Sequence, residues 1–95
     1  MPQNYVEAAR WYRKGSDQGN ADAQAALGML CFLGKGVPRD IVFAHMWLNL
    51  AASRSPVGFQ KGASELGDQV AAAMTPAQIA EAQRLAREWK PTATK

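Results

Sequence analysis

The spacing of hydrophobic and polar positions predicts a chain built from helices. From Tyr5 to Ser16, apolar or aromatic residues recur every three or four positions and charged residues fill the gaps, which is the pattern of an amphipathic helix. The segment from Ala21 is apolar over most of its length and predicts a second, more buried helix. Glycines and a proline in residues 34–38 predict a turn, so the first two helices form a hairpin.

The second half of the chain predicts three further helices. A helix over about residues 41–52 is apolar on nearly all sides, which is typical of a helix sandwiched between others. Residues 53–58 predict a loop, and a less regular helix follows over about residues 59–73. The last helix, over about residues 76–90, has a wide polar face, so we expect it to cap the C-terminal end of the fold.

Side chains that cap helix N-termini mark where three of these helices begin. Asn4 and Asp40 each precede an apolar run, and their side chains can accept hydrogen bonds from the unpaired amides of the first turn. Thr75, Pro76 and Gln78 provide a threonine cap, a proline at the first helical position and a glutamine at the third, the elements of a capping box. We therefore expect helices to begin directly after Asn4, Asp40 and Thr75.

Part of the chain repeats with a period of 36 residues. This shift places Trp11 on Trp47 and Ala8 on Ala44. The chain has only three tryptophans, so two of them in matching contexts indicate a repeated helix more strongly than matching alanines do. We therefore expect the helical hairpin to occur twice.

Length and composition fit one all-α domain. The 95 residues are rich in alanine and poor in strand formers, which disfavours a β-barrel or sandwich. The predicted organisation is a single domain over residues 1–95 with about five helices: a first repeat over 4–38, a second over 39–74 whose second helix is irregular, a capping helix over 75–90 and a tail over 91–95.

Charge, cysteine content and hydropathy narrow the function classes. The net charge of +3 comes from 11 basic and 8 acidic residues spread along the chain, so we expect no nucleic-acid partner. No apolar stretch approaches the roughly 18 residues that span a bilayer, and the N-terminus lacks the order of a signal peptide, so we expect no membrane insertion. The single Cys31 and the single His45 exclude an internal disulfide and a four-ligand zinc site, and no metal or cofactor is expected.

The compartment, cytoplasmic or periplasmic, stays open, and the lone thiol favours a reducing interior only slightly. The sequence also leaves open whether the chain is a whole protein or a piece of a longer repeat array.

Three stretches of the chain carry one connected motif. They read A-x-x-W-Y-x-K-x-x-x-Q-G from Ala8 to Gly19, A-x-x-x-L-G-x-x-C-x-x-G-x-G-V-x-x-D from Ala23 to Asp40, and A-x-x-W-L-x-x-A-A from Ala44 to Ala52. Together they resemble Sel1-like repeats, which are relatives of tetratricopeptide repeats, and the period of 36 residues suits the Sel1 family better. The closing TPAQIAEAQRLAREW resembles the last helix of many bacterial Sel1-like proteins.

The resemblance implies a right-handed α-α superhelix. It also implies the function of the family's members, which act as adaptors that bind other proteins and have no catalytic activity of their own. Gly15 and Cys31 depart from the family pattern, which usually has alanine and tyrosine there, and both remove side-chain volume from the helix packing. Trp11 and Trp47 are expected to pack between helices. The positions expected to be structural, from the motifs and the helix caps, are Ala8, Trp11, Tyr12, Gly19, Leu27, Gly28, Gly34, Gly36, Ala44, Trp47, Thr75 and Pro76.

Basic residues on the first helix are the main candidates for contact with a partner. Arg10, Arg13 and Lys14 place three positive charges there, and the 36-residue shift aligns Arg10 with Met46 and Arg13 with Asn49. A surface that is both basic and partly apolar suits an acidic peptide or a C-terminal carboxylate, to which Arg13 offers bidentate geometry. The alternative is an ordinary solvated face.

His45 and Asn49 are further candidates because they lie one helical turn apart on an otherwise apolar helix. Two interpretations remain open. These residues line a groove together with the basic residues of the first helix, or they simply form a polar helix face or an inward hydrogen bond. Catalysis is not supported, since no diagnostic motif pairs Cys31 with His45 and the glycine-rich turn lacks the spacing of a phosphate-binding loop. Glu81 and Glu88 are better explained as surface charge than as an acid/base pair.

Two functions follow from these observations. The first is a non-enzymatic interaction module that binds another protein or peptide in a groove formed mainly by the first helices of the repeats. The second is a structural or self-assembling unit, in which Tyr5, Val6, Ala9 and Tyr12 leave an apolar end free to stack on another copy.

Overall fold

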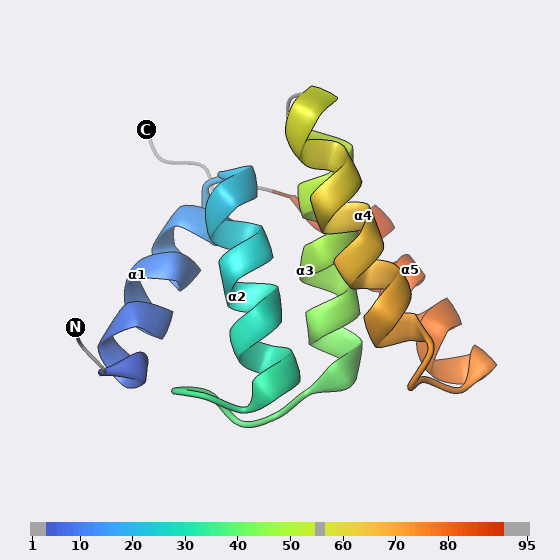
Figure 1. Cartoon of the computed structure of the whole chain (residues 1–95), viewed down its shortest axis with the longest axis horizontal. Helices are drawn as coiled ribbons and strands as arrows, with labels where there is room; N and C mark the ends of the chain where they lie inside the picture. The colour runs from blue at the N-terminus through green and yellow to red at the C-terminus, as the bar shows by residue number, and fades with distance from the viewer. Residues whose placement is uncertain (1–3, 55–56, 91–95) are drawn as a thin grey trace.

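The structure, a computed structural model, describes residues 4–54 and 57–90, and these residues form five helices with no strand among them. The helices are α1 (Tyr5–Asp17), α2 (Ala21–Leu33), α3 (Ile41–Arg54), α4 (Val57–Ala71) and α5 (Pro76–Glu88). Helices α1 to α4 lie side by side in a row, with α5 behind it (Figure 1). The all-α fold class is thus confirmed, whereas the division into repeats and the right-handed sense of the superhelix stay predictions.

Side-chain caps begin four of the helices. The side chains of Asn4, Asp40 and Thr75 each accept a hydrogen bond from the backbone N–H three residues further on, at 3.1, 3.0 and 3.1 Å. The Gln78 side chain in turn accepts one from the Thr75 backbone N–H at 2.9 Å, which completes the capping box. Asn20 caps α2 in the same way, since its side chain accepts a hydrogen bond of 2.9 Å from the Ala23 backbone N–H.

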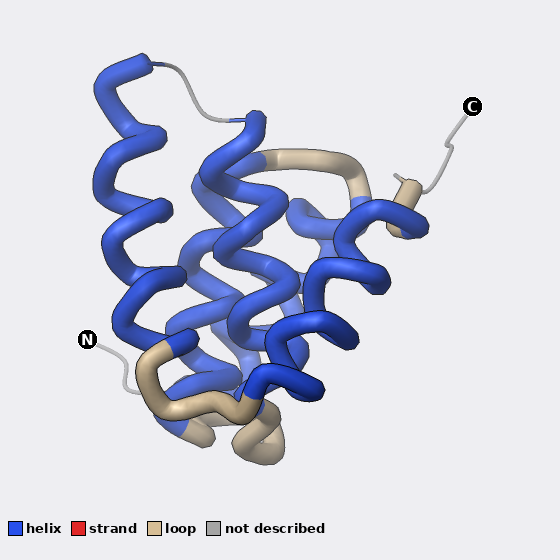
Figure 2. The backbone as a smooth tube through the Cα atoms, turned by 90° about the vertical axis from the view of Figure 1, so that its right-hand side faces the viewer, coloured by secondary structure: helices blue, strands red, loops and turns tan. Residues whose placement is uncertain are grey.

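Helix α3 is central to the fold. Its contact with α2 is the most extensive between any two helices, and it also packs against α4 and α5, whereas α1 packs mainly against α2. Figure 2 shows the helices running alongside one another, with the connections at their ends. The sandwiched position predicted for this helix is confirmed, because its apolar residues are needed on several sides at once.

The core lies mainly between α2, α3 and α4. Its buried residues are Leu27, Cys31, Ala44, Met46, Trp47, Leu48, Leu50 and Val70. Gly28 allows α2 to approach α3 closely, since an added Cβ would lie 3.0 Å from Leu48 Cγ and 3.1 Å from the Ala44 carbonyl oxygen. Gly15 does the same between α1 and α2, where an added Cβ would lie 2.9 Å from Ala23 Cβ. The departure from the family's alanine at Gly15 therefore suits the tight packing of this hairpin.

Two turns hold the first three helices together. Gly19, with φ of 93°, closes the turn between α1 and α2, and the buried Gln24 side chain donates a hydrogen bond of 3.2 Å to the Ser16 carbonyl across it. Gly34 ends α2 in the left-handed conformation, with φ of 71°. Gly36, with φ of 78°, passes so close to the Tyr5 carbonyl that an added Cβ would overlap it. The turn after α2 is thereby fixed against the start of α1.

The predicted loop over residues 53–58 is wrong at four of its positions. Helix α3 continues through Arg54 and α4 begins at Val57, while Ser55 and Pro56, like the predicted tail over 91–95, lie outside the described residues. The Ser53 hydroxyl donates a hydrogen bond of 3.0 Å to the Leu50 carbonyl, which accommodates this polar side chain within the last turn of α3.

Trp11 corrects the expectation that both matched tryptophans pack between helices. Trp47 is 4% exposed, its Cβ faces Gly28 of α2, and its ring meets that of Trp89 edge-on with centroids 6.0 Å apart. Trp11 is 67% exposed, and the Lys14 ammonium lies 5.6 Å from its ring centroid. The expectation fails for Trp11 because, among the described helices, none packs on this face of α1 as α2 packs on α3.

Candidate functional site

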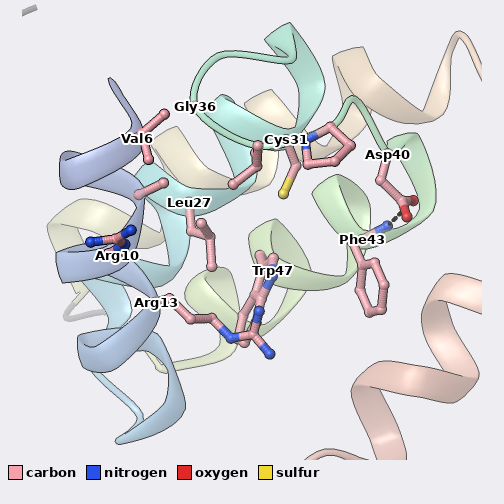
Figure 3. Close-up of a pocket in the computed structure, with 12 residues that line it drawn as sticks. Val6, Arg10, Arg13, Leu27, Cys31, Gly36, Asp40, Phe43 and Trp47 are labelled. Atoms are coloured by element: carbon pink, nitrogen blue, oxygen red, sulfur yellow. Dashed lines mark hydrogen bonds between the residues drawn. The ribbon is translucent and has the colours of Figure 1, made fainter. Parts of the chain in front are cut away.

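A groove of about 550 Å³ lies between α1 and α3, with α2 as its base (Figure 3). We call it the α1–α3 groove. The residues that line it come from α1 (Val6, Ala9, Arg10, Arg13), α2 (Leu27, Cys31), the turn after α2 (Gly36, Val37, Pro38, Asp40) and α3 (Phe43, Trp47).

The lining is mostly apolar, and part of it is open to solvent. Phe43 on α3 is 44% exposed, and Val6 opposite it on α1 is also exposed. Leu27, Cys31 and Trp47 are buried and form the deep part of the groove. Phe43 and Trp47 share one face of α3 because they are four residues apart.

The α1 wall of the groove carries two arginines. Arg13 Nε lies 3.1 Å from Asp17 Oδ1 in an exposed ion pair. Arg10 has no carboxylate within ion-pair distance among the described residues. Asp40 is the acidic residue of the lining, and its carboxylate caps α3. The groove therefore combines an apolar base with a positive charge on its wall that is free to meet an anion.

Cys31 contributes a neutral thiol to the base. Burial raises the pKa of the Cys31 thiol, the negative charge of Asp40 raises it further, and Arg13 opposes the shift. A buried thiol of raised pKa is a poor nucleophile, so this residue acts as a small apolar side chain.

A second hollow of about 330 Å³ adjoins the groove between α3 and α5. Arg13, Phe43 and Trp47 line both cavities, and α5 adds Leu85, Glu88 and the following Trp89 to the second. Glu88 and Glu81 both pair with Arg84, at 2.9 and 2.6 Å, in exposed ion pairs. The side chains of α1, α3 and α5 thus share one face of the molecule.

The structure separates the residues that the sequence grouped together. Arg10 and Arg13 line the groove, whereas His45 and Asn49 line a different hollow of about 180 Å³ between α3 and α4, beside Asp68. The expectation that these four share a groove is therefore wrong, because His45 and Asn49 face α4. For the same reason Cys31 and His45 belong to different cavities and do not meet.

Lys14 also lies outside the groove. Its ammonium lies beside the Trp11 ring, in a shallow hollow lined by residues of α1. Phe43 is an exposed lining residue that the sequence did not indicate as a candidate. Val6 and Ala9, which were expected at a free apolar end of the fold, line the groove instead. The spacing of Phe43 from Trp47, four residues along a helix, is the signal that would have placed it there.

His45 should make the stability of the fold depend on pH. Its Nδ1 is buried without a hydrogen-bond partner among the described residues, and burial lowers the pKa of His45, with Asp68 opposing the shift. Below the ordinary histidine pKa of about 6.5, the unfolded chain takes up a proton that the folded chain resists, so stability falls as pH decreases through this range. Between pH 7.5 and pH 5.5, the free energy of unfolding measured with urea should fall more for the wild type than for His45→Gln. An equal fall in the two proteins would show that His45 does not cause the pH dependence.

Paired helices that pack in sequence, with the first helix of each pair on a shared face, define a helical-repeat protein. The model of the Sel1 repeat family matches residues 1–20 and 21–56, more than half of the chain. The chain therefore belongs to the Sel1 repeat family, whose repeats generally mediate interactions between proteins.

Among curated proteins, the chain is similar to the chitin synthase regulator SKT5 of the fungus Malassezia restricta. The two are 39% identical over 51 residues, which is 54% of this chain and 4% of that protein. The chain thus spans only a small part of this relative. No solved structure matches the chain significantly.

None of the helices formed by the described residues is both long enough and apolar enough to cross a membrane. The same residues contain no group of three or more histidine, cysteine, aspartate or glutamate side chains placed to hold a metal ion.

Proposed function

We propose that this chain is a non-enzymatic protein-interaction module that binds a peptide segment or helix of a partner in the α1–α3 groove, on the concave face of the repeat superhelix. The observation that carries the proposal is the combination, in one cavity, of exposed Phe43, a buried apolar base and the unpaired cation of Arg10. An apolar anchor of the partner would fill the base, and an acidic side chain or terminal carboxylate would pair with Arg10.

Family membership supports this role, since Sel1 repeats generally bind proteins. The neutral Cys31 thiol, and its separation from His45, support a module without catalytic activity. The name of the fungal relative describes a regulator of an enzyme, which suits an adaptor that acts by binding. Bacterial origin, which the closing helix suggested, stays a prediction.

Panning a phage-displayed library of random dodecapeptides against the immobilised chain tests the proposal. We expect enrichment of peptides in which an aromatic or aliphatic residue stands next to acidic residues. Phe43→Ala should weaken binding of the enriched peptides by at least about tenfold, as for an aromatic anchor at the centre of an interface. Leu33→Ala is the matched control, because Leu33 at the end of α2 is similarly exposed but does not line the groove.

A matched pair of variants tests whether binding requires the positive charge in the groove. Arg10→Gln and Lys14→Gln remove the same charge from the same helix one turn apart, but only Arg10 lines the α1–α3 groove. Arg10→Gln should weaken binding severalfold and Lys14→Gln should not. The proposal is overturned if no peptide is enriched, or if the enriched peptides bind the Phe43→Ala and Arg10→Gln variants as well as they bind the wild type.

A further inference from the structure

The outer face of α1 carries an aromatic surface that no described helix covers. Trp11 and Tyr12 are both exposed on this helix. Trp11 lines a shallow hollow of about 410 Å³ together with Glu7, Arg10, Arg13 and Lys14. Arg10 and Arg13 also line the α1–α3 groove, so the two surfaces meet at these arginines. Large exposed aromatic residues on one helix face are typical of an interaction surface.

The contact between α3 and α2 indicates what kind of helix fits this face of α1. The 36-residue shift places Ala8, Trp11 and Tyr12 on Ala44, Trp47 and Leu48. In α3, those three residues meet α2 at Gly28, where the absent side chain lets the two helices approach. The equivalent face of α1 therefore suits a helix that offers a small residue at the point of contact.

The outward side of α4 offers such a helix. Gly62, Glu65 and Asp68 follow one another at helical spacing and are exposed, with Asp68 at the edge that also borders the α3–α4 hollow. A Cβ added at Gly62 would meet open space. Among the described side chains, no lysine or arginine pairs with Glu65 or Asp68. A small, acidic helix surface thus complements the basic, aromatic surface around Trp11.

We propose that the outer face of α1 docks on the outward side of α4 of a second copy of this chain. Figure 1 places α1 and α4 at opposite ends of the row of helices, so the contact joins two different surfaces and continues the row from copy to copy. Trp11 supplies the apolar contact, and Lys14 faces Glu65 and Asp68 across the junction.

Sedimentation equilibrium of the chain from micromolar to millimolar concentration tests this proposal. The weight-average mass should rise with concentration beyond that of a dimer, and the rise should weaken at high salt, because salt screens exposed charges. Trp11→Ala should lower the association constant at least about tenfold. Phe43→Ala, a matched removal of an exposed aromatic side chain from the groove, should leave association unchanged.

Charge reversal identifies α4 as the partner surface. Lys14→Glu and Glu65→Lys should each weaken association, and the double variant should recover it because the pair is restored in the opposite sense. The proposal is overturned if the chain stays monomeric at every concentration, if assembly stops at a dimer, if Trp11→Ala associates like the wild type, or if the double variant does not recover.

Discussion

Replacing Trp47 with alanine is expected to lower the free energy of unfolding by about 3–5 kcal/mol, the range for removing a large buried aromatic side chain. Trp47 is 4% exposed, lies against Gly28 of α2 and packs edge-on against Trp89. Its loss would open a cavity at the junction of α2, α3 and α5. A chain of this length has about 5–14 kcal/mol of stability in total, so the variant would keep only part of it.

Trp11→Ala is the matched control, since the same residue type occupies the equivalent position of the repeat. Trp11 is exposed, so its loss should change the free energy of unfolding by no more than about 0.5 kcal/mol. Urea unfolding followed by circular dichroism, at a concentration low enough to avoid self-association, measures both variants. Similar losses of unfolding free energy in the two variants would contradict the difference in burial. If Trp47→Ala does not fold, Trp47→Phe should still fold, with a lower free energy of unfolding than the wild type.

Gly36→Ala is expected to destabilise the fold by about 2–5 kcal/mol. The left-handed conformation of Gly36, with φ of 78°, disfavours any side chain by about 1–2 kcal/mol. The added methyl group would also overlap the Tyr5 carbonyl, and overpacking of this kind typically adds about 1–3 kcal/mol. The start of α1 and the turn after α2 would have to move apart.

Gly62→Ala controls for the general effect of replacing a glycine. Gly62 lies within α4, and a Cβ there meets open space, so alanine should stabilise the helix by about 0.5–1 kcal/mol. Thermal or urea unfolding should therefore move in opposite directions for the two variants. If Gly36→Ala keeps the stability of the wild type, the turn around Gly36 tolerates a side chain and the prediction is wrong. If Gly62→Ala loses as much stability as Gly36→Ala, the loss is a general effect of replacing glycine and not of the contact with Tyr5.

The sequence predicted helix starts well because caps are local. Asn4, Asp40 and Thr75 each lie within three residues of the N–H that they accept, so neighbouring residues determine the interaction. The number of helices around a residue is a non-local property. Trp11 and Trp47 share the same local motif, yet one is exposed and the other is buried, because α2 covers α3 and no described helix covers the same face of α1.

The candidate site was predicted only in part, since α3 is apolar on nearly every side. A helix with an apolar stripe shows which face is buried, but α3 packs against α2, α4 and α5 and gives no such direction. Phe43 and His45 are two residues apart and therefore point to nearly opposite sides, about 200° around the helix. The groove residue Phe43 was missed for this reason, and His45 and Asn49 were assigned to the wrong face.

Helix α1 forms one wall of the α1–α3 groove, yet its main contact is with α2. In a repeat fold, local opening depends on the interfaces with neighbouring units, so α1 should fray before the helices around α3 come apart. A ligand that contacted both α1 and α3 would give α1 a second attachment and would stabilise it against local unfolding. Recognition of a partner and local ordering of the N-terminal helix would then be a single event.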